Sequence, residues 1–77
     1  MKSEKNTYQP KEQTAMFTQR EREILNLMIR GRTNQEIAEE MIISINTAKA
    51  HVSNILNKLG VKDRVQAVVK AIRCNLI

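Results

Sequence analysis

The chain has 77 residues, with 13 lysines and arginines against 8 aspartates and glutamates and a formal net charge of +5. This length allows one domain with a modest core, and the positive charge favours a polyanion or an anionic membrane as partner. A single cysteine, Cys74, excludes an internal disulfide and suits a reducing, cytoplasmic setting. No apolar run approaches the length of a membrane span or signal peptide, so no membrane partner is expected.

The number of aromatic residues distinguishes single-stranded nucleic acid from double-stranded DNA as the partner. Tyr8 and Phe17 are the only aromatic residues, whereas single-strand binders need several aromatic side chains on which bases stack. Double-stranded DNA needs none. One histidine, one cysteine and one aspartate, spread over different predicted helices, offer neither a metal cluster nor a nucleophile with its base. We therefore expect no enzyme activity and no catalytic, metal or cofactor site.

The first predicted segment is a flexible N-terminal tail or interdomain linker over residues 1–16. Residues 2–14 are polar, contain the only proline and show no apolar period. From Phe17 onward the pattern changes to helical segments and shows no strand-like alternation. The sequence thus predicts one all-α, four-helix domain over residues 17–77.

Four helices are expected, over residues 19–30, 34–41, 45–59 and 64–73. Three of them begin with capping-box spacing, in which a side chain satisfies a backbone N–H of the first turn. Gly31 and Gly60 supply stop signals for the first and third helices. The start signals are Thr18 with Glu21, Thr33 with Glu36, Asp63 with Gln66, and Ser44 as an N-cap.

The third expected helix has two contrasting faces when its residues are placed at about 100° intervals. Its apolar stripe, predicted to be buried, consists of Ile45, Ala48, Val52, Ile55, Leu56 and Leu59. The opposite face carries small or neutral side chains, namely Asn46, Thr47, Ala50, Ser53, Asn54 and Asn57. Lys49 lies on one shoulder of that face, and His51 and Lys58 lie on the other.

This second face suits the major groove of DNA, where short polar groups meet base edges and flanking cations meet phosphates. No acidic residue occurs between Glu40 and Asp63. An ordinary solvated helix face would mix glutamate with lysine, because such pairs stabilise helices. For His51, helix packing or a partly buried hydrogen bond stays open beside contact with the DNA backbone.

The order of elements also matches a helix-turn-helix. A short helix over 34–41 is followed by a turn of Ile42, Ile43 and Ser44 and then by the longer polar-faced helix. The turn is unusual in having no glycine. The N–H groups that begin the short helix, at Thr33 and Asn34, could hold a phosphate.

The blocks TQREREIL, GRTNQEIA, ISINTAKAH, KL and RVQA occur in order within residues 17–73. They resemble the LuxR/FixJ-type helix-turn-helix domain, especially the output domains of NarL-type response regulators. The NQEIA and HVSNIL runs resemble Gram-positive members that answer cell-envelope stress. The resemblance implies that Lys49, Ala50 and Ser53 meet bases or nearby phosphates and that Lys58 lies near the DNA backbone. Ala48 departs from the family's usual valine and underfills a core position.

The resemblance further implies pairing through the last helix. On a helical wheel, Val65, Val68, Val69 and Ile72 form one stripe and Ala67 and Ala71 a smaller patch. Capping the core needs only the first stripe, so part of this surface, Val68 with Ala71 or Val65, is expected to be left for a second copy. Burial of both patches within one chain is the alternative. The expected dimer interface is Val65, Val68, Val69, Ala71 and Ile72.

Such domains usually follow a receiver or a ligand-binding domain, and neither occurs in this sequence. Residues 2–14 are therefore either a linker at the start of an excised piece or the short N-terminus of a free-standing regulator. We expect a sequence-specific regulator of transcription bound to promoter DNA, with RNA polymerase as a candidate further partner. The expected DNA contacts are Thr33, Asn34, Asn46, Thr47, Lys49, Ala50, His51, Ser53, Asn54, Asn57 and Lys58.

Two alternative classes remain open beside this interpretation. A protein-interaction bundle would explain exposed apolar residues, but it would not explain the acid-free face. Salt-sensitive binding to duplex DNA would discriminate between the two. Sigma-factor region 4 begins with a similar helix, but its recognition helix is typically richer in arginine and glutamate.

Overall fold

The computed structural model describes residues 16–75, so all of the tail expected over 1–16 except Met16 lies outside the described residues. The described part contains α2 (Gln19–Ile29), α3 (Asn34–Met41), α4 (Ile45–Leu59) and α5 (Arg64–Arg73), and no strand. The predicted all-α architecture with a helix-turn-helix is confirmed. The only difference in bounds is that α2 ends one residue early, with Arg30 as its C-cap.

The helix starts follow the capping signals in the sequence. Thr18 and Thr33 complete full capping boxes, in which each hydroxyl accepts from the N3 backbone and the N3 glutamate accepts from the cap. Ser44 accepts from the backbone N–H of Thr47. Asp63 accepts from the Gln66 backbone. Local hydrogen bonds therefore define where all four described helices begin.

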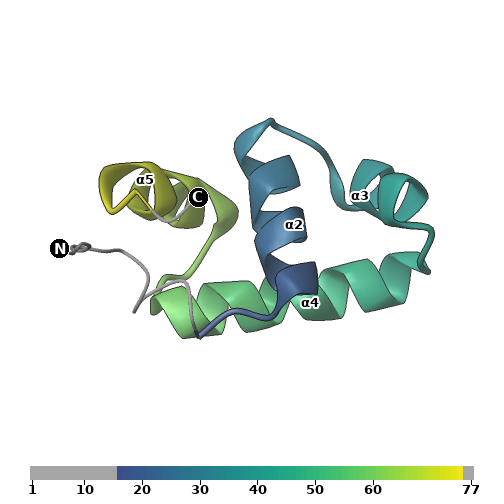
Figure 1. Ribbon diagram of the computed structural model, residues 1–77, viewed down its shortest axis with the longest axis horizontal. Helices are drawn as coiled ribbons and strands as arrows, with labels where there is room; N and C mark the ends of the chain where they lie inside the picture. Colours follow the sequence, from purple (N-terminus) through teal and green to yellow (C-terminus); the bar gives the residue numbers. More distant parts are fainter. Residues whose placement is uncertain (1–15, 76–77) are drawn as a thin grey trace, which may run out of the picture.

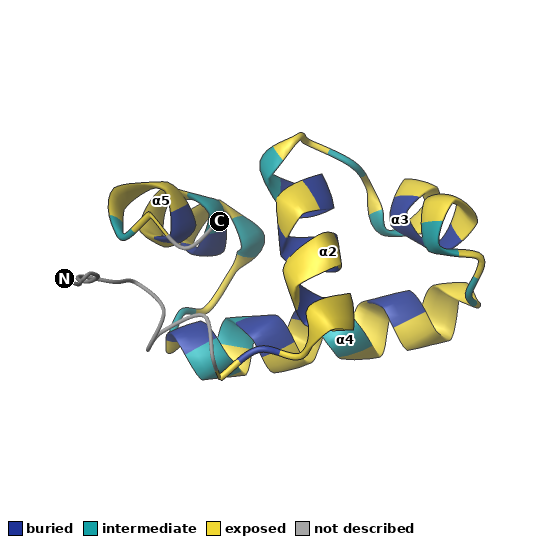
Figure 2. Cartoon of the chain, viewed as in Figure 1, coloured by how far each residue is buried: buried dark blue, intermediate teal, exposed yellow. Residues whose placement is uncertain are grey.

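The helix α4 contacts each of the other three helices. Figure 1 shows α3, α2 and α5 arranged along its length, from its N-terminal to its C-terminal end. The core lies where they meet, and Figure 2 shows buried positions on every helix. Its buried apolar residues are Phe17, Ile24, Leu25, Leu27, Met28, Ile37, Ala38, Ala48, Val52, Ile55, Leu59, Ala67 and Ala71.

The buried stripe predicted for α4 is confirmed except at its first residue. Ile45 is 41% exposed, whereas Leu56 packs partly buried against the core and the other four residues are buried. A wheel treats a helix as equally covered along its length, but burial in the first turn depends on the preceding loop. Ile43, from that loop, packs against the core.

The turn without glycine places Ile42 in the left-handed region, at φ 57° and ψ 52°. Its backbone N–H still bonds to the end of α3, and the Ile43 N–H donates to the Ala38 carbonyl at 3.0 Å. A β-branched side chain is unfavourable in this conformation. Ile42 is also 89% exposed, so little burial offsets the strain.

We predict that Ile42→Asn stabilises the domain by about 1 kcal/mol, because asparagine tolerates the left-handed conformation. Urea unfolding would measure the change. The matched variant Ile42→Val keeps the β-branch and should show no gain. A loss of stability in Ile42→Asn would mean that the exposed isoleucine makes contacts that its burial does not reveal.

Candidate nucleic-acid interface

The proposed DNA-facing side of α4 is open to solvent. No aspartate or glutamate occurs in this helix, and the nearest along the chain are Glu40 and Asp63. Lys49 makes no hydrogen bond or ion pair within the described residues, so its charge is available to a ligand. The exposed residues of this face are Asn46, Thr47, Lys49, Ala50, Ser53, Asn54 and Asn57.

The first turn of α4 is fixed by its N-cap. The Ser44 hydroxyl donates to Thr47 Oγ1 at 2.9 Å and accepts from the Thr47 backbone N–H at 3.0 Å. Both side chains are exposed, yet each is held in place by the other. The start of the exposed face is therefore ordered before any ligand binds.

The polar groups at the start of α3 have more hydrogen-bond partners within the domain than the sequence indicated. The Thr33 N–H donates to the Glu36 carboxylate at 2.9 Å, which also brings a negative charge to this helix end. Arg64 of α5 donates to the side-chain oxygen of Asn34 and, at 2.8 Å, to the Arg32 carbonyl. Arg64 thus adds a cation beside Thr33 and Asn34 that sequence analysis did not include, although it begins the RVQA block.

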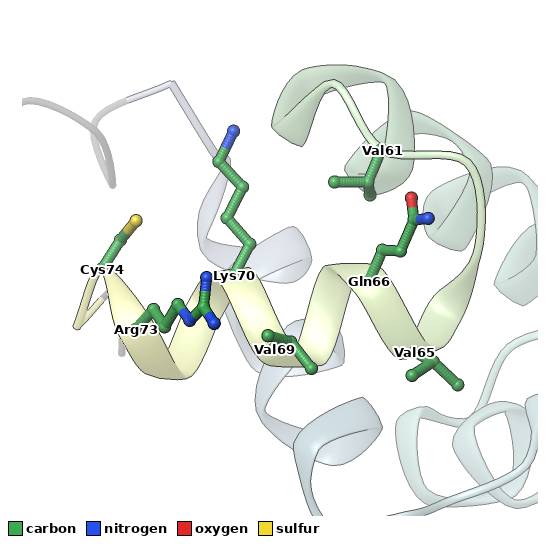
Figure 3. A pocket seen from close by; sticks show the side chains of 7 residues that line it. All are labelled: Val61, Val65, Gln66, Val69, Lys70, Arg73 and Cys74. Carbon is green, nitrogen blue, oxygen red and sulfur yellow. The ribbon is translucent and has the colours of Figure 1, made fainter.

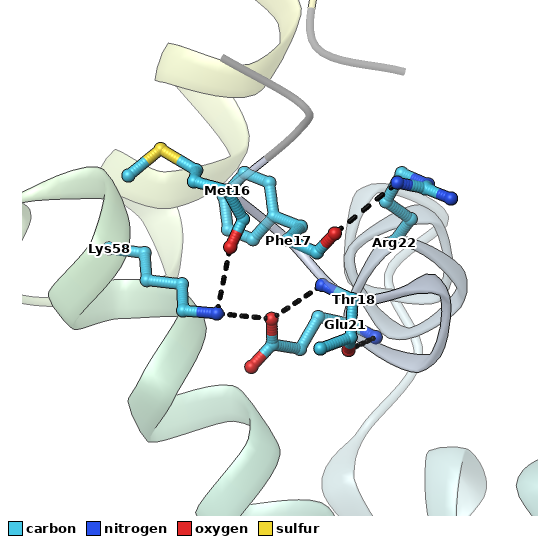
Figure 4. Close-up of polar contacts among 6 residues, drawn as sticks. All are labelled: Met16, Phe17, Thr18, Glu21, Arg22 and Lys58. Carbon is cyan, nitrogen blue, oxygen red and sulfur yellow. Dashed lines mark hydrogen bonds and ion pairs between the residues drawn. The ribbon is translucent and has the colours of Figure 1, made fainter. Parts of the chain in front are cut away.

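Lys58 was expected to face the DNA backbone, but it is held within the domain. Its ammonium lies 2.7 Å from Glu21 Oε1 and donates to the Met16 carbonyl at 2.8 Å. It also lies 5.9 Å from the centre of the Phe17 ring. Figure 4 shows Lys58 extending from α4 to these groups. The sequence carried no signal for this pairing, since 37 residues separate Lys58 from Glu21.

Glu21 is the one buried charged residue in the described part of the chain, at 4% exposure. Burial by itself raises the pKa of its carboxyl. Hydrogen bonds from Lys58 and the Thr18 backbone, together with the charges of Lys58 and His51, outweigh burial, so its pKa lies below the ordinary 4.5. Half-buried His51 is therefore close enough to Glu21 to act on its carboxyl electrostatically. Glu21 is thus ionised at neutral pH.

We expect the Glu21–Lys58 pair to make stability depend on pH in the acidic range. Because folding lowers the pKa of Glu21, the contribution is fully present above the ordinary value of 4.5 and is lost as pH falls through the folded-state pKa. In urea unfolding, Glu21→Gln should therefore be less stable than wild type at neutral pH, and the difference should shrink below pH 4.5.

The exposed Glu23→Gln on the same helix is the control and should change stability little at either pH. A difference between wild type and Glu21→Gln that stays constant on acidification would contradict the lowered pKa.

The outer surface of α5 differs from the expected one. Ala67 and Ala71 are fully buried, and Val68 packs partly buried against the core. The predicted role of Ala71 in contacting a second copy is thus not available, because it already packs within the chain. The stripe expected to cap the core is instead largely exposed: Val65 is 71%, Val69 44% and Ile72 58% exposed. Alanine is small, so the buried side lets α5 approach its neighbours closely.

A groove of about 480 Å³ lies beside this exposed stripe. Figure 3 shows side chains of α5 and of the preceding loop around it. Valines and two cationic residues line it, and the Lys70 ammonium donates to the Leu59 carbonyl at 2.7 Å. The lining residues are Val61, Val65, Gln66, Val69, Lys70, Arg73 and Cys74.

Residues 16–75 lack the features of a metal site and of a membrane span. No group of three histidine, cysteine, aspartate or glutamate residues there is placed to hold a metal ion. In the same residues, no helix has the length and apolar character needed to cross a membrane.

A short helix, a tight turn and a longer helix with an exposed, acid-free face define a helix-turn-helix DNA-binding domain. The model of the family described as "Bacterial regulatory proteins, luxR family" matches residues 15–71. The chain belongs to this family, and it is a LuxR-type DNA-binding domain homologous to segments of response regulators.

Relatives of known name agree with this assignment. The "Response regulator protein VraR" of Staphylococcus aureus (strain NCTC 8325 / PS 47) is 58% identical over 62 residues, which are 80% of this chain and 30% of VraR. VraR of Staphylococcus epidermidis matches to the same extent. The chain thus spans under a third of the length of these relatives.

Solved structures give the same picture. The transcription factor GerE superposes with a TM-score of 0.72 and 38% identity, over 79% of this chain and 91% of GerE. The response regulator ChrA, from a heme-sensing two-component system, superposes with a TM-score of 0.74 and 38% identity, over 78% of this chain and 30% of ChrA.

Proposed function

We propose that this domain binds promoter DNA sequence-specifically as the output domain of a two-component response regulator. It acts on DNA in the cytoplasm, where it recruits or positions RNA polymerase, and it performs no catalysis of its own. The observation that carries the proposal is the exposed face of α4, which combines small hydrogen-bonding side chains with Lys49 and lacks acid. The response regulators VraR and ChrA, which share this domain, support the proposed class of parent protein.

In this proposal α4 lies in the major groove. Ser53, Asn54 and Asn57 contact base edges, because hydroxyl and amide groups can both donate and accept hydrogen bonds there. Ala50 adds no bulk between the helix and the bases, and Lys49 neutralises phosphate. Asn46 and Thr47, near the N-cap, approach the groove edge. Thr33 and Asn34 approach a neighbouring phosphate together with the guanidinium of Arg64, and half-buried His51 at the shoulder stays within electrostatic reach of Glu21.

Two variants distinguish residues that contribute to DNA affinity in general from residues that determine base specificity. Lys49→Ala should weaken binding to specific and random duplexes alike and reduce the salt slope by about one unit, because one phosphate contact is lost. Replacing Ser53, Asn54 and Asn57 together by alanine should instead cost about 1 to 3 kcal/mol per contacted base pair and leave random-duplex binding nearly unchanged.

Selection of binding sites from a random library would supply the specific duplex, and fluorescence anisotropy over a range of salt would measure both effects. Asn26→Ala, on the exposed side of α2, is a control that should alter neither quantity. If the triple variant kept the wild-type preferred sequence, α4 would not be the element that reads the bases.

We also propose that two copies pair through α5. Val65, Val69 and Ile72 form an exposed apolar stripe on a short helix whose opposite side is fully packed. Such a small interface is weak in free solution. Two adjacent half-sites on one duplex strengthen it, because they raise the effective concentration of each copy for the other.

Val69→Asp should therefore abolish the two-protein complex on a full site while leaving one-protein binding to a half-site unchanged. Gel shifts would follow both complexes, and circular dichroism would confirm folding. Val69 is a sharper target than Val68, which also packs against the core. Asn26→Asp adds the same charge on α2 and should leave pairing intact. Wild-type cooperativity in folded Val69→Asp would exclude this interface.

A further inference from the structure

The segment that leads into α2 is fastened to the DNA-facing helix α4. Lys58 donates to the backbone carbonyl of Met16 at 2.8 Å and to Glu21 Oε1 at 2.7 Å. Glu21 Oε1 also accepts from the Thr18 N–H at 2.9 Å. One ammonium group therefore joins α4, the start of α2 and residues 16–18, which we call the junction. Figure 4 shows all three parts meeting at Lys58.

These contacts hold the junction and α2 to a defined place on α4. Phe17 is 3% exposed and its ring lies 5.9 Å from the Lys58 ammonium, while its carbonyl accepts from Arg22 at 3.3 Å. Lys58 directly follows Asn57 and lies one turn beyond Asn54, so both proposed base-contacting side chains are close to it along the helix. Lys58 therefore anchors the stretch of α4 that carries these two asparagines.

Lys58 cannot serve Glu21 and a DNA phosphate at once without weakening one of the two. Removing the ammonium would leave a carboxylate that is 4% exposed without its cationic partner, which is unfavourable. Lys49 differs in that it is exposed and makes no such contacts within the described residues. The two lysines of α4 therefore have different environments, although in the sequence both are cations at the edges of the same helix face.

We infer that Lys58 is a positioning residue, which sets the orientation of α4 for base contact by binding Glu21 and the Met16 carbonyl, and which stays on them in the DNA complex. The inference rests on the proposed DNA-binding function. The bond to Met16 is made to its main chain, so this coupling passes to the backbone that enters the domain. Specific DNA binding therefore requires that the junction be held in its place on α4.

The test compares Lys58→Met and Glu21→Gln with Lys49→Met on a specific and a random duplex. Glu21→Gln removes the charge but keeps a side-chain oxygen for the Thr18 N–H. Lys58→Met and Glu21→Gln should each weaken specific binding about tenfold, the effect of disturbing one good base contact, with random binding and the salt slope unchanged. The double variant should be no weaker than either single one, because both disrupt the same pair. Lys49→Met should weaken both duplexes and lower the slope.

Nitrogen-15 NMR of lysine ammonium groups provides a second measurement on the wild-type protein. The Lys58 signal should be protected from rapid exchange in the free protein and shift little when DNA binds, whereas the Lys49 signal should shift. Loss of salt slope in Lys58→Met, or a large Lys58 shift on DNA, would show that it binds phosphate and would overturn the inference alone. Absence of salt-sensitive duplex binding by the wild-type protein would overturn the proposed function as well.

Discussion

The structure depends on α4 being packed along one side only. Three helices cover that side, and the buried residues Ala48, Val52, Ile55 and Leu59 fix its rotation about its own axis. Once this rotation is fixed, the remaining side chains must form the exposed face. A shift of one residue in the packing would turn apolar groups outward and the asparagines inward. The core therefore determines which groups can meet a ligand.

The fold could be predicted from the sequence where its determinants are local. Capping pairs such as Thr18 with Glu21 lie within one turn, and a helix stop such as Gly60, at φ 71°, depends only on its own backbone conformation. Burial of Ile45 and the packing side of α5 could not be predicted in this way. Both depend on which neighbour covers them, and periodicity does not indicate whether a valine stripe faces the core or a missing partner.

The residues of the candidate site also fall into two groups, those that could be predicted from the sequence and those that could not. The exposed face of α4 lies on one continuous helix, so its composition and arrangement follow directly from the sequence. The charges at its edges depend on distant partners instead: Lys58 on Glu21, and Arg64 on Asn34 and the Arg32 carbonyl. A cation's sequence position on a wheel indicates where its side chain begins, but not which anion or carbonyl receives its hydrogen bonds.

The pairing of Lys58 with Glu21 limits how many cations α4 itself can offer to DNA phosphates. The formal charge of +5 counts Lys58, which is already paired with Glu21, whereas Arg64 bonds to an uncharged amide and a carbonyl and keeps its charge. Lys49 is the cation of α4 that stays unpaired among the described residues, so α4 itself offers one lysine to a phosphate without rearrangement. A recognition helix with one unpaired cation would gain DNA affinity from a second copy bound to the same duplex. In the proposed dimer, the exposed stripe of α5 would supply the surface for that second copy, so that DNA binding and pairing would use the same small helix bundle.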